Sequence, residues 1–421
     1  MEDGQRVTIR GVRCIRCGTA YAVTEWPRGC PRCFEEGRPS AVAPALDLSV
    51  IDPAALKETW TTAGRGMWRF HHLLPVPVED AVSLEEGGTP LLRLRTLEDE
   101  FGIGALWVKD ERRNPTGSFK DRFFSVCLSR ARSQGAEVVA IASSGNGGAS
   151  AAAYAAAAGI TCVVITTPSI APAWRAAIAM TGARLVAART GAERWKLLQT
   201  GVESLNWYPL TNYVTPPAGS NWYGIQGYKT IAYEIAMSLD WDVPDWVVVP
   251  TSRGDGLFGI WRGFVELAEL GLTRSVPRMV AAERFPSLTV ALQQGLDYPP
   301  TVESEPTQAV SIGNDTATYQ SLHTLRASQG VAVACSDADM RAGVRALGRE
   351  GIFAELSAAA SIAAVKGLVE RGLADRSARI VAVVTASGLT DPGAALGDAE
   401  PLEPIPPTVD ALRAAVLARS R

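Results

Sequence analysis

The chain has few histidines, no long apolar runs and no excess of basic charge. Its 421 residues include only three histidines, His71, His72 and His323, which argues against a histidine triad or a histidine-rich metal centre as the catalytic machinery. The longest apolar runs, such as 149–160, are alanine-rich and too short to span a bilayer. A formal net charge of −3 gives nothing to attract nucleic acid. We therefore expect neither a nucleic-acid partner nor a membrane partner.

The beginning of the chain and its bulk composition carry two further expectations. The polar start, Met1-Glu2-Asp3-Gly4, lacks a signal-peptide pattern, so a cytoplasmic location is expected. With 47% hydrophobic and 20% charged residues, the chain has enough apolar material for a large core.

The seven cysteines are divided unevenly. Four of them form the pattern C-x2-C-x12-C-x2-C: Cys14, Cys17, Cys30 and Cys33. Two such knuckles can bring four thiolates into a tetrahedron around zinc, and a segment of about 35 residues has too little core to fold alone. The alternative is a pair of disulfides, which a cytosolic location disfavours. The pattern predicts a zinc ribbon over residues 1–38, with a structural metal because four thiolates leave no position open for a substrate.

One lysine stands in a turn of small residues, in the sequence Asn-Pro-Thr-Gly-Ser-Phe-Lys-Asp-Arg at 114–122. Pro115 and Gly117 predict the turn, and Ser118 is expected to begin the next helix. In this setting the amine of Lys120 could attack an aldehyde carbonyl, as the lysine of a pyridoxal phosphate enzyme does. For a lone lysine, the alternative is a surface residue after an ordinary helix cap.

A first glycine turn follows an apolar run at 138–142 and precedes an alanine-rich helical run at 149–158. Its sequence is Ser143-Ser144-Gly145-Asn146-Gly147-Gly148. Such a turn aims backbone N–H groups and the positive end of a helix at an anion, here a substrate carboxylate, while Asn146 can reach a phenolic oxygen. The alternative is a tight turn that needs glycine for backbone reasons alone.

A second loop of small residues follows the apolar run 246–251 and precedes a helical run at 258–270. Unhindered backbone donors, the helix dipole and the charge of Arg253 predict a phosphate cradle. Asp255 beside a phosphate would be repulsive, so its side chain is expected to turn away and cap the following helix. The loop consists of Ser252, Arg253, Gly254, Asp255 and Gly256.

Strands and helices alternate along most of the chain, which predicts an α/β fold with two open, mostly parallel sheets and helices on both faces. The expected strands are 138–142, 162–166, 184–188, 246–251, 279–282 and 379–384. Sheets that face each other across a cleft would place the glycine turns at the carboxyl ends of strands, where open sheets bind ligands. A Pro/Ala-rich connector is expected at 39–53, within an N-terminal extension over 39–84, and a catalytic body over 85–421.

Together these segments resemble threonine synthase and the wider group of pyridoxal phosphate enzymes of the tryptophan synthase β type, called fold type II. The resemblance covers residues from about 85 to 395. It implies that Lys120 forms the Schiff base, that Phe119 packs beside the cofactor and that Asn146 binds the 3-hydroxyl of its ring. It also implies a carboxylate site at Ser143, Ser144, Gly145 and Gly147, the cofactor phosphate at the 252–256 loop, and the ring nitrogen at Thr385 or Ser387.

The chain departs from the family pattern where an arginine would hold a substrate phosphate. The family's Asn-Pro-Tyr-Arg-Ile-Glu-Gly-Gln-Lys-Thr corresponds here to 221–230, with Gly224 in place of the arginine. Asn221 is expected to bind substrate. The lost charge could be replaced by one of four basic residues that are otherwise expected on the solvated surface: Lys109, Arg112, Arg113 or Lys229. Later in the chain, 353–361 resembles the family's Glu-Pro-x-Ser/Thr-Ala-Ala-Ser segment. Glu355 is then expected near the cofactor ring, or else as a carboxylate that complements a helix dipole.

The resemblance implies a pyridoxal phosphate-dependent carbon–oxygen lyase or replacement enzyme acting on an activated homoserine or serine derivative. Lys120 would move the α-proton, and a neutral hydroxyl at the ring nitrogen suits elimination and replacement better than transamination. The loss at Gly224 leaves two alternatives open: β-replacement of the cysteate synthase kind and serine/threonine ammonia-lyase activity. A non-catalytic binding module is disfavoured because Lys120, Asn146 and Thr385 all persist. A smaller mobile domain at about 125–225 and a homodimer are also implied by the resemblance.

Overall fold

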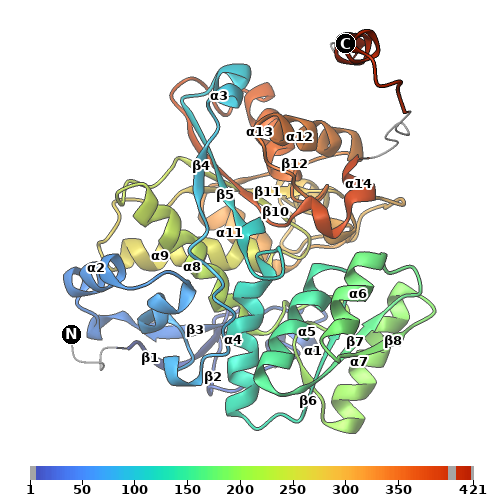
Figure 1. Ribbon diagram of the computed structural model, residues 1–421. Helices are drawn as coiled ribbons and strands as arrows, with labels where there is room; N and C mark the ends of the chain where they lie inside the picture. The colour runs from blue at the N-terminus through green and yellow to red at the C-terminus, as the bar shows by residue number, and fades with distance from the viewer. Residues whose placement is uncertain (1–5, 397–403, 419–421) are drawn as a thin grey trace.

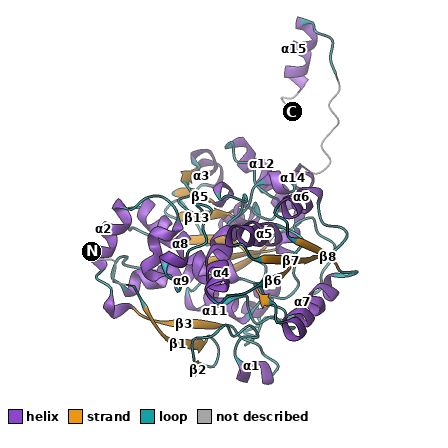
Figure 2. Cartoon of the chain, turned by 60° about the horizontal axis from the view of Figure 1, so that its bottom comes forward, coloured by secondary structure: helices purple, strands orange, loops and turns teal. Residues whose placement is uncertain are grey.

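Three sheets organise the computed structural model, which describes residues 6–396 and 404–418. A ribbon sheet lies at the N-terminal end of the chain, a six-stranded sheet forms the larger layer, and a four-stranded sheet forms the smaller one (Figure 1). The last helix, α15 (Val409–Ala418), stands apart from the body in both overall views (Figures 1 and 2). Within the described residues, no helix combines the length and apolarity that a bilayer crossing requires.

The six-stranded sheet has the order β12-β11-β10-β13-β5-β4, and every pair is parallel except β4 with β5. Its strands are nearly continuous apolar runs because helices cover both faces. In β10, for example, Val247 and Val249 enter the core beneath α8 and α9, whereas Trp246 and Val248 enter the core beneath α12 and α13. The strands are β4 (Leu91–Arg93), β5 (Ala105–Asp110), β10 (Trp246–Pro250), β11 (Arg278–Glu283), β12 (Val331–Ala334) and β13 (Arg379–Val384). The helices are α3 (Arg95–Phe101), α8 (Trp222–Ser238), α9 (Asp255–Glu269), α10 (Ser287–Gln293), α11 (Tyr319–Ala327), α12 (Asp337–Arg349), α13 (Ala360–Glu370) and α14 (Pro392–Leu396).

The four-stranded sheet is entirely parallel, in the order β8-β7-β6-β9. It consists of β6 (Val138–Ala142), β7 (Thr161–Thr166), β8 (Arg184–Ala187) and β9 (Tyr208–Pro209), with α4 (Lys120–Ser133), α5 (Asn146–Ala158), α6 (Pro172–Met180) and α7 (Gly191–Leu205). The predicted α/β fold class is thus confirmed, and each expected strand lies within one or two residues of its predicted bounds.

The ribbon sheet contains β1 (Thr8–Cys14), β2 (Ala20–Tyr21) and β3 (Val42–Asp47), and α1 (Pro31–Glu35) carries the second cysteine pair. The prediction of a connector over 39–53 was wrong in part, because β3 lies inside it and pairs antiparallel with β1. This pairing satisfies backbone groups along one edge of β1 that would otherwise be exposed. The chain then continues into α2 (Pro53–Thr62), which Asp52 caps through the backbone N–H of Ala54 at 2.9 Å.

Helices α4 and α8 approach each other closely because Gly227 has no side chain. A Cβ at Gly227 would lie 1.9 Å from the carbonyl oxygen of Arg122 on α4. This contact fixes the beginning of α4, and with it Lys120, against the middle of α8.

A buried ion cluster also joins α4 to α8 and β5. The guanidinium of Arg122 donates to both carboxylate oxygens of Glu111, at 2.7 and 2.8 Å, and to both of Glu234, at 2.8 and 2.7 Å. Lys109 adds a second cation, 2.6 Å from Glu234. Burial alone would raise the pKa of Glu234, but the charges of Arg122 and Lys109 hold it well below its usual value. The carboxylate therefore stays ionised inside the protein.

Candidate active site

A cavity of about 550 Å³ lies at the carboxyl ends of β6, β7, β10 and β13. Both predicted glycine loops line it, together with Phe119, Lys120 and Thr385. Since parallel strands from both sheets end here, the position follows the rule that open sheets bind ligands beyond the carboxyl ends of their strands.

Lys120 is the first residue of α4, and its side chain points into the protein rather than into solvent. Its Nζ donates to the hydroxyl of Tyr228 at 3.2 Å. Burial lowers the pKa of Lys120, although the charges of Asp255 and Glu355 partly oppose this. Burial also raises the pKa of Tyr228 well above its usual value, so the phenol stays protonated. The cavity thus contains an amine that loses its proton more easily than a surface lysine does.

The prediction that Ser118 begins the helix was wrong. Helix α4 starts at Lys120 with Phe119 in the capping position, and no side chain caps it. The hydroxyl of Ser118 is buried without a partner in the described chain. The backbone of Phe119 instead donates to the carbonyl of Thr385 at 2.9 Å, which ties the lysine turn to the end of β13.

The first glycine turn is held in shape by its own serines. Ser143 accepts hydrogen bonds through Oγ from the backbone N–H groups of Gly145, at 3.3 Å, and Gly148, at 3.0 Å. The hydroxyl of Ser144 lies 2.9 Å from that of Thr166. Residues 143–147 all line the cavity at the N-terminus of α5, a position where backbone donors and the helix dipole favour an anion.

Asn146 is engaged at both ends of its amide. Its Nδ2 donates to the carboxylate of Glu355, and its Oδ1 accepts from the indole of Trp174 at 3.1 Å. Burial raises the pKa of Glu355, while hydrogen bonds that include those from Asn146 and Thr390 oppose the shift. Because α13 begins only at Ala360, Glu355 is not placed to complement the dipole of that helix. Its predicted position near the cofactor ring stays a prediction.

The 252–256 loop forms the second wall of the cavity and leads into α9. Gly254 has φ +93°, and a Cβ there would lie 2.3 Å from the Cβ of Ser321, so only glycine fits. The prediction that Asp255 caps α9 was wrong, because Gly254 holds the capping position and no side chain caps the helix. The carboxylate of Asp255 accepts from the backbone and hydroxyl of Ser220, at 3.1 and 2.7 Å, and from Gln320.

Of the two hydroxyls predicted at the ring nitrogen, only one lies in the cavity. Thr385 lines it, whereas the hydroxyl of Ser387 accepts from the backbone of Leu389 at 3.3 Å and stabilises a short turn outside the lining. Ser357, which the sequence did not single out, also lines the cavity, and its buried hydroxyl has no partner in the described chain.

Two predicted substrate-binding residues lie outside the cavity lining. Lys109 is fully buried and ion-paired with Glu234, so it cannot replace the missing arginine. Asn221 caps α8 by accepting from the backbone of Tyr223 at 3.0 Å. The other three residues suggested to replace the charge of the family's arginine are also ion-paired. Lys229 pairs with Glu266 at 3.0 Å. Arg112 and Arg113 pair with Asp110 at 2.7 and 3.2 Å.

The structure explains why no side chain stands at position 224. A Cβ on Gly224 would lie 2.7 Å from the ring of Phe123, which lines the cavity. Tyr228 lies four residues after Gly224 and therefore on the same face of α8. The departure from the family pattern at Gly224 was thus a signal by which Tyr228 could have been predicted at the cavity. Arg194 and Trp174 also line the cavity, and no sequence motif points to either of them.

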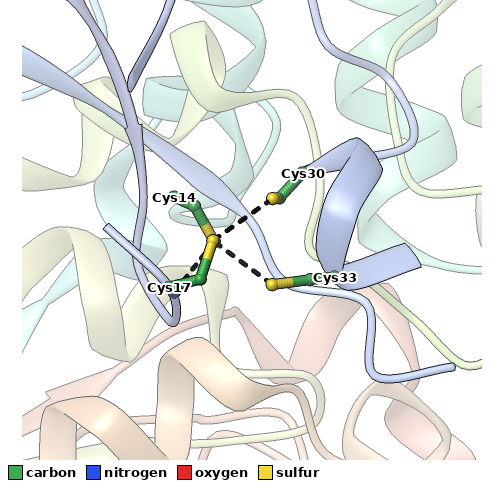
Figure 3. Close-up of side chains that lie close together, drawn as sticks. All are labelled: Cys14, Cys17, Cys30 and Cys33. Atoms are coloured by element: carbon green, nitrogen blue, oxygen red, sulfur yellow. Dashed lines mark hydrogen bonds between the residues drawn. The ribbon is translucent and has the colours of Figure 1, made fainter. Parts of the chain in front are cut away.

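The four N-terminal cysteines converge, Cys14 and Cys17 from one side and Cys30 and Cys33 from the other (Figure 3). Their sulfur atoms all lie within 4.8 Å of one another. The separations of 3.6 Å for Cys14 to Cys33 and 3.7 Å for Cys17 to Cys30 exceed the roughly 2.05 Å of a disulfide. They match the roughly 3.8 Å expected between thiolates that share one tetrahedral zinc ion at about 2.3 Å.

Comparisons with known proteins agree with this arrangement. The model of the family described as pyridoxal-phosphate dependent enzyme matches residues 82–386. The chain is 37% identical to a threonine synthase of Methanocaldococcus jannaschii, covering 93% of this chain and 95% of that protein. It is 33% identical to a threonine synthase of Methanosarcina acetivorans, covering 97% and 99%.

Solved structures share the fold at lower identity. The processed form of threonine deaminase isoform 2 from Solanum lycopersicum gives a TM-score of 0.63 at 18% identity, covering 82% of this chain and 87% of that one. An O-ureido-L-serine-bound mutant of O-ureido-L-serine synthase gives 0.62 at 21% identity, covering 82% and 100%. With the family model and the threonine synthases matching most of its length, the chain belongs to the pyridoxal-phosphate dependent enzymes and is a threonine synthase-like lyase.

Proposed function

We propose that the enzyme eliminates a leaving group from an activated homoserine or serine derivative, with Lys120 as its catalytic amine, and then adds water or another nucleophile. The observation that carries this proposal is the desolvated amine of Lys120, with its lowered pKa, in a cavity lined by two glycine loops. The threonine synthases among its relatives support the same chemistry.

The cavity fits pyridoxal phosphate. Gly254 and Gly256 keep the 252–256 loop free of side chains, and a Cβ on Gly256 would lie 2.7 Å from the ring of Phe119. This loop at the N-terminus of α9 suits the cofactor phosphate. The unpartnered hydroxyl of Ser357 and that of Thr385 offer neutral groups for the polar edge of the ring, while the amide of Asn146 suits its 3-hydroxyl. The 143–147 turn then remains for the substrate carboxylate.

The bound cofactor supplies an electron sink that acidifies the α-carbon of the substrate. Lys120 Nζ removes the α-proton, because its buried amine is easily kept neutral and Tyr228 holds it by a hydrogen bond. The leaving group departs with the electron pair of its carbon–oxygen bond, and the protonated Nζ then returns a proton to carbon. The phenol of Tyr228, which stays protonated, orients Nζ throughout.

Serine/threonine ammonia-lyase activity is the second candidate. It is favoured by Phe123, whose ring leaves no room for a phosphate-binding side chain at Gly224. The two candidates differ in their products: the first gives the released leaving group, which is phosphate for a phosphorylated substrate, and a new amino acid, and the second gives a keto acid and ammonia.

The test uses purified enzyme with bound cofactor and the substrates O-phospho-L-homoserine, O-phospho-L-serine, L-serine and L-threonine. Phosphate, amino-acid product, keto acid and ammonia are measured. Lys120→Ala should abolish turnover and the visible absorption of the lysine-bound cofactor, whereas Lys366→Ala, on the exposed side of α13, should change neither. Undiminished turnover by Lys120→Ala would overturn the proposal.

We also propose that the four cysteines hold a structural zinc ion, which their sulfur distances support. The four-stranded sheet with α4 to α7 is proposed as the smaller domain that moves on substrate binding. The homodimer and the cytoplasmic location stay predictions. Light scattering after size-exclusion chromatography measures the oligomeric state.

A further inference from the structure

Arg194 is a cation of the cavity wall without an acidic partner. It lies on α7, lines the cavity and donates through Nη1 to the hydroxyl of Ser144 at 2.8 Å. No carboxylate of the described chain lies within ion-pair distance of it, and its Nη2 makes no hydrogen bond to the described residues. Burial lowers the pKa of Arg194, so the site costs stability unless an anion compensates the charge.

Three fully buried cations of the body are compensated by carboxylates. Arg122 and Lys109 share Glu234, and Lys229 pairs with Glu266. Arg194 and Arg253 differ from these three because both line the cavity and neither has an ion pair among the described residues. An arginine with free donors in a ligand cavity is typical of a site that recognises a carboxylate or phosphate.

The neighbourhood of Arg194 adds positive charge. The next residue, Trp195, carries the guanidinium of Arg253 over its ring, 4.8 Å from the centroid. Burial lowers the pKa of Arg253, the charges of Asp255 and Asp315 oppose this shift, and the charge of Arg194 adds to it. The nearest acidic group of the loop, Asp255, is held by Ser220 and Gln320. This side of the cavity consequently favours an anion.

Ser144 connects Arg194 to the predicted carboxylate turn. Its hydroxyl contacts both Arg194 and Thr166, so Arg194 lies beside that turn. Thr167 and Ser169 extend this wall with hydroxyls 3.0 Å apart. A substrate whose carboxylate occupies the turn would reach Arg194 with a second anionic group.

We propose that Arg194 binds an anionic group on the side chain of the substrate and so selects phosphorylated or similarly charged amino acids over neutral ones. This inference rests on the proposed function and gives its substrate class. It assigns to α7 the task that position 224 on α8 cannot perform, because Phe123 fills the space there.

The test compares Arg194→Gln, Arg194→Lys and the wild type on O-phospho-L-serine and O-phospho-L-homoserine against L-serine and L-homoserine. Arg194→Gln should raise KM for the phosphorylated amino acids about 10- to 150-fold, the factor for losing a hydrogen bond to a charged group. Its KM for neutral amino acids should change less than about threefold, and Arg194→Lys should restore part of the loss. Arg189→Gln, an exposed arginine shortly before α7, is the matched control.

Binding of O-phospho-L-serine is measured in parallel by titration calorimetry, so that the result does not depend on turnover. An equal loss for both substrate classes would overturn the inference, since Arg194 would then only position Ser144. Equal binding of O-phospho-L-serine by the wild type and Arg194→Gln would overturn it as well. If no amino acid is turned over but this binding still depends on Arg194, the proposed function fails while the anion site stands.

Discussion

Replacing Arg122 by methionine should destabilise the protein strongly, because the guanidinium sits between two buried carboxylates. It donates to Glu111 and Glu234 at 2.7 to 2.8 Å, and none of these three side chains is more than 2% exposed. Removing one partner of a buried ion cluster costs about 3 to 5 kcal/mol. That is a large part of the roughly 5 to 15 kcal/mol by which proteins are stable. After the change, Lys109 would be the remaining cation of the cluster, and Glu111 would keep only hydrogen bonds from neutral groups such as Thr89 at 2.6 Å.

The assay is urea unfolding followed by tryptophan fluorescence at pH 7 and pH 5. For a slope of about 2 to 3 kcal/mol per molar, the midpoint at pH 7 should fall by about 1 to 2.5 M. The pKa of Glu234 is lowered in the folded wild type, so its stabilisation is complete above the unfolded value of about 4.3 and is lost only as the pH falls through the lowered folded value. In Arg122→Met the pKa of Glu234 is lowered less, and burial favours its protonated form. The difference in unfolding free energy between the wild type and the variant should therefore be smaller at pH 5 than at pH 7.

The matched control is Arg113→Met, whose side chain is 67% exposed beside Asp110 and should cost less than about 1 kcal/mol. If Arg122→Met lowers the free energy of unfolding by less than about 1 kcal/mol, or by the same amount at both pH values, the reasoning is refuted.

Two further predictions concern α8 and the ribbon. Gly224→Arg should lower the free energy of unfolding by about 1 to 3 kcal/mol, since its Cβ would lie 2.7 Å from the ring of Phe123. Calorimetric melting of this variant, of Phe123→Ala and of the double variant checks this. If the double variant loses as much stability as the two single variants together, the clash with Phe123 is not the cause and the prediction is wrong. Removing zinc with a chelator, or replacing Cys33 by serine, should lower the melting temperature, because the ribbon has little core of its own. Elemental analysis should find one zinc per chain in the wild type, and an unchanged melting curve after verified zinc loss would count against a structural role.

Much of the site could be predicted from the sequence because its parts are local. The lysine turn, the two glycine loops and the cysteine knuckles each need particular residues at fixed spacing for backbone reasons, as the +93° φ of Gly254 illustrates. Where the prediction depended on a side chain's partner, it failed more often. Asp255 was expected to cap α9, yet Ser220 and Gln320, from distant segments, bind its carboxylate.

The sequence by itself determined the family and the α/β alternation, and it predicted Lys120 as the reactive lysine, since covalent spacing and hydrophobic periodicity encode such features directly. Only the tertiary structure decided which charges are available to a ligand. Lys109 and Arg194 are both basic residues in the sequence, but folding places Lys109 against Glu234 and leaves Arg194 unpaired at the cavity. The physical reason is that the free energy of a charge depends on the groups that surround it after folding, and these come from segments far apart along the chain.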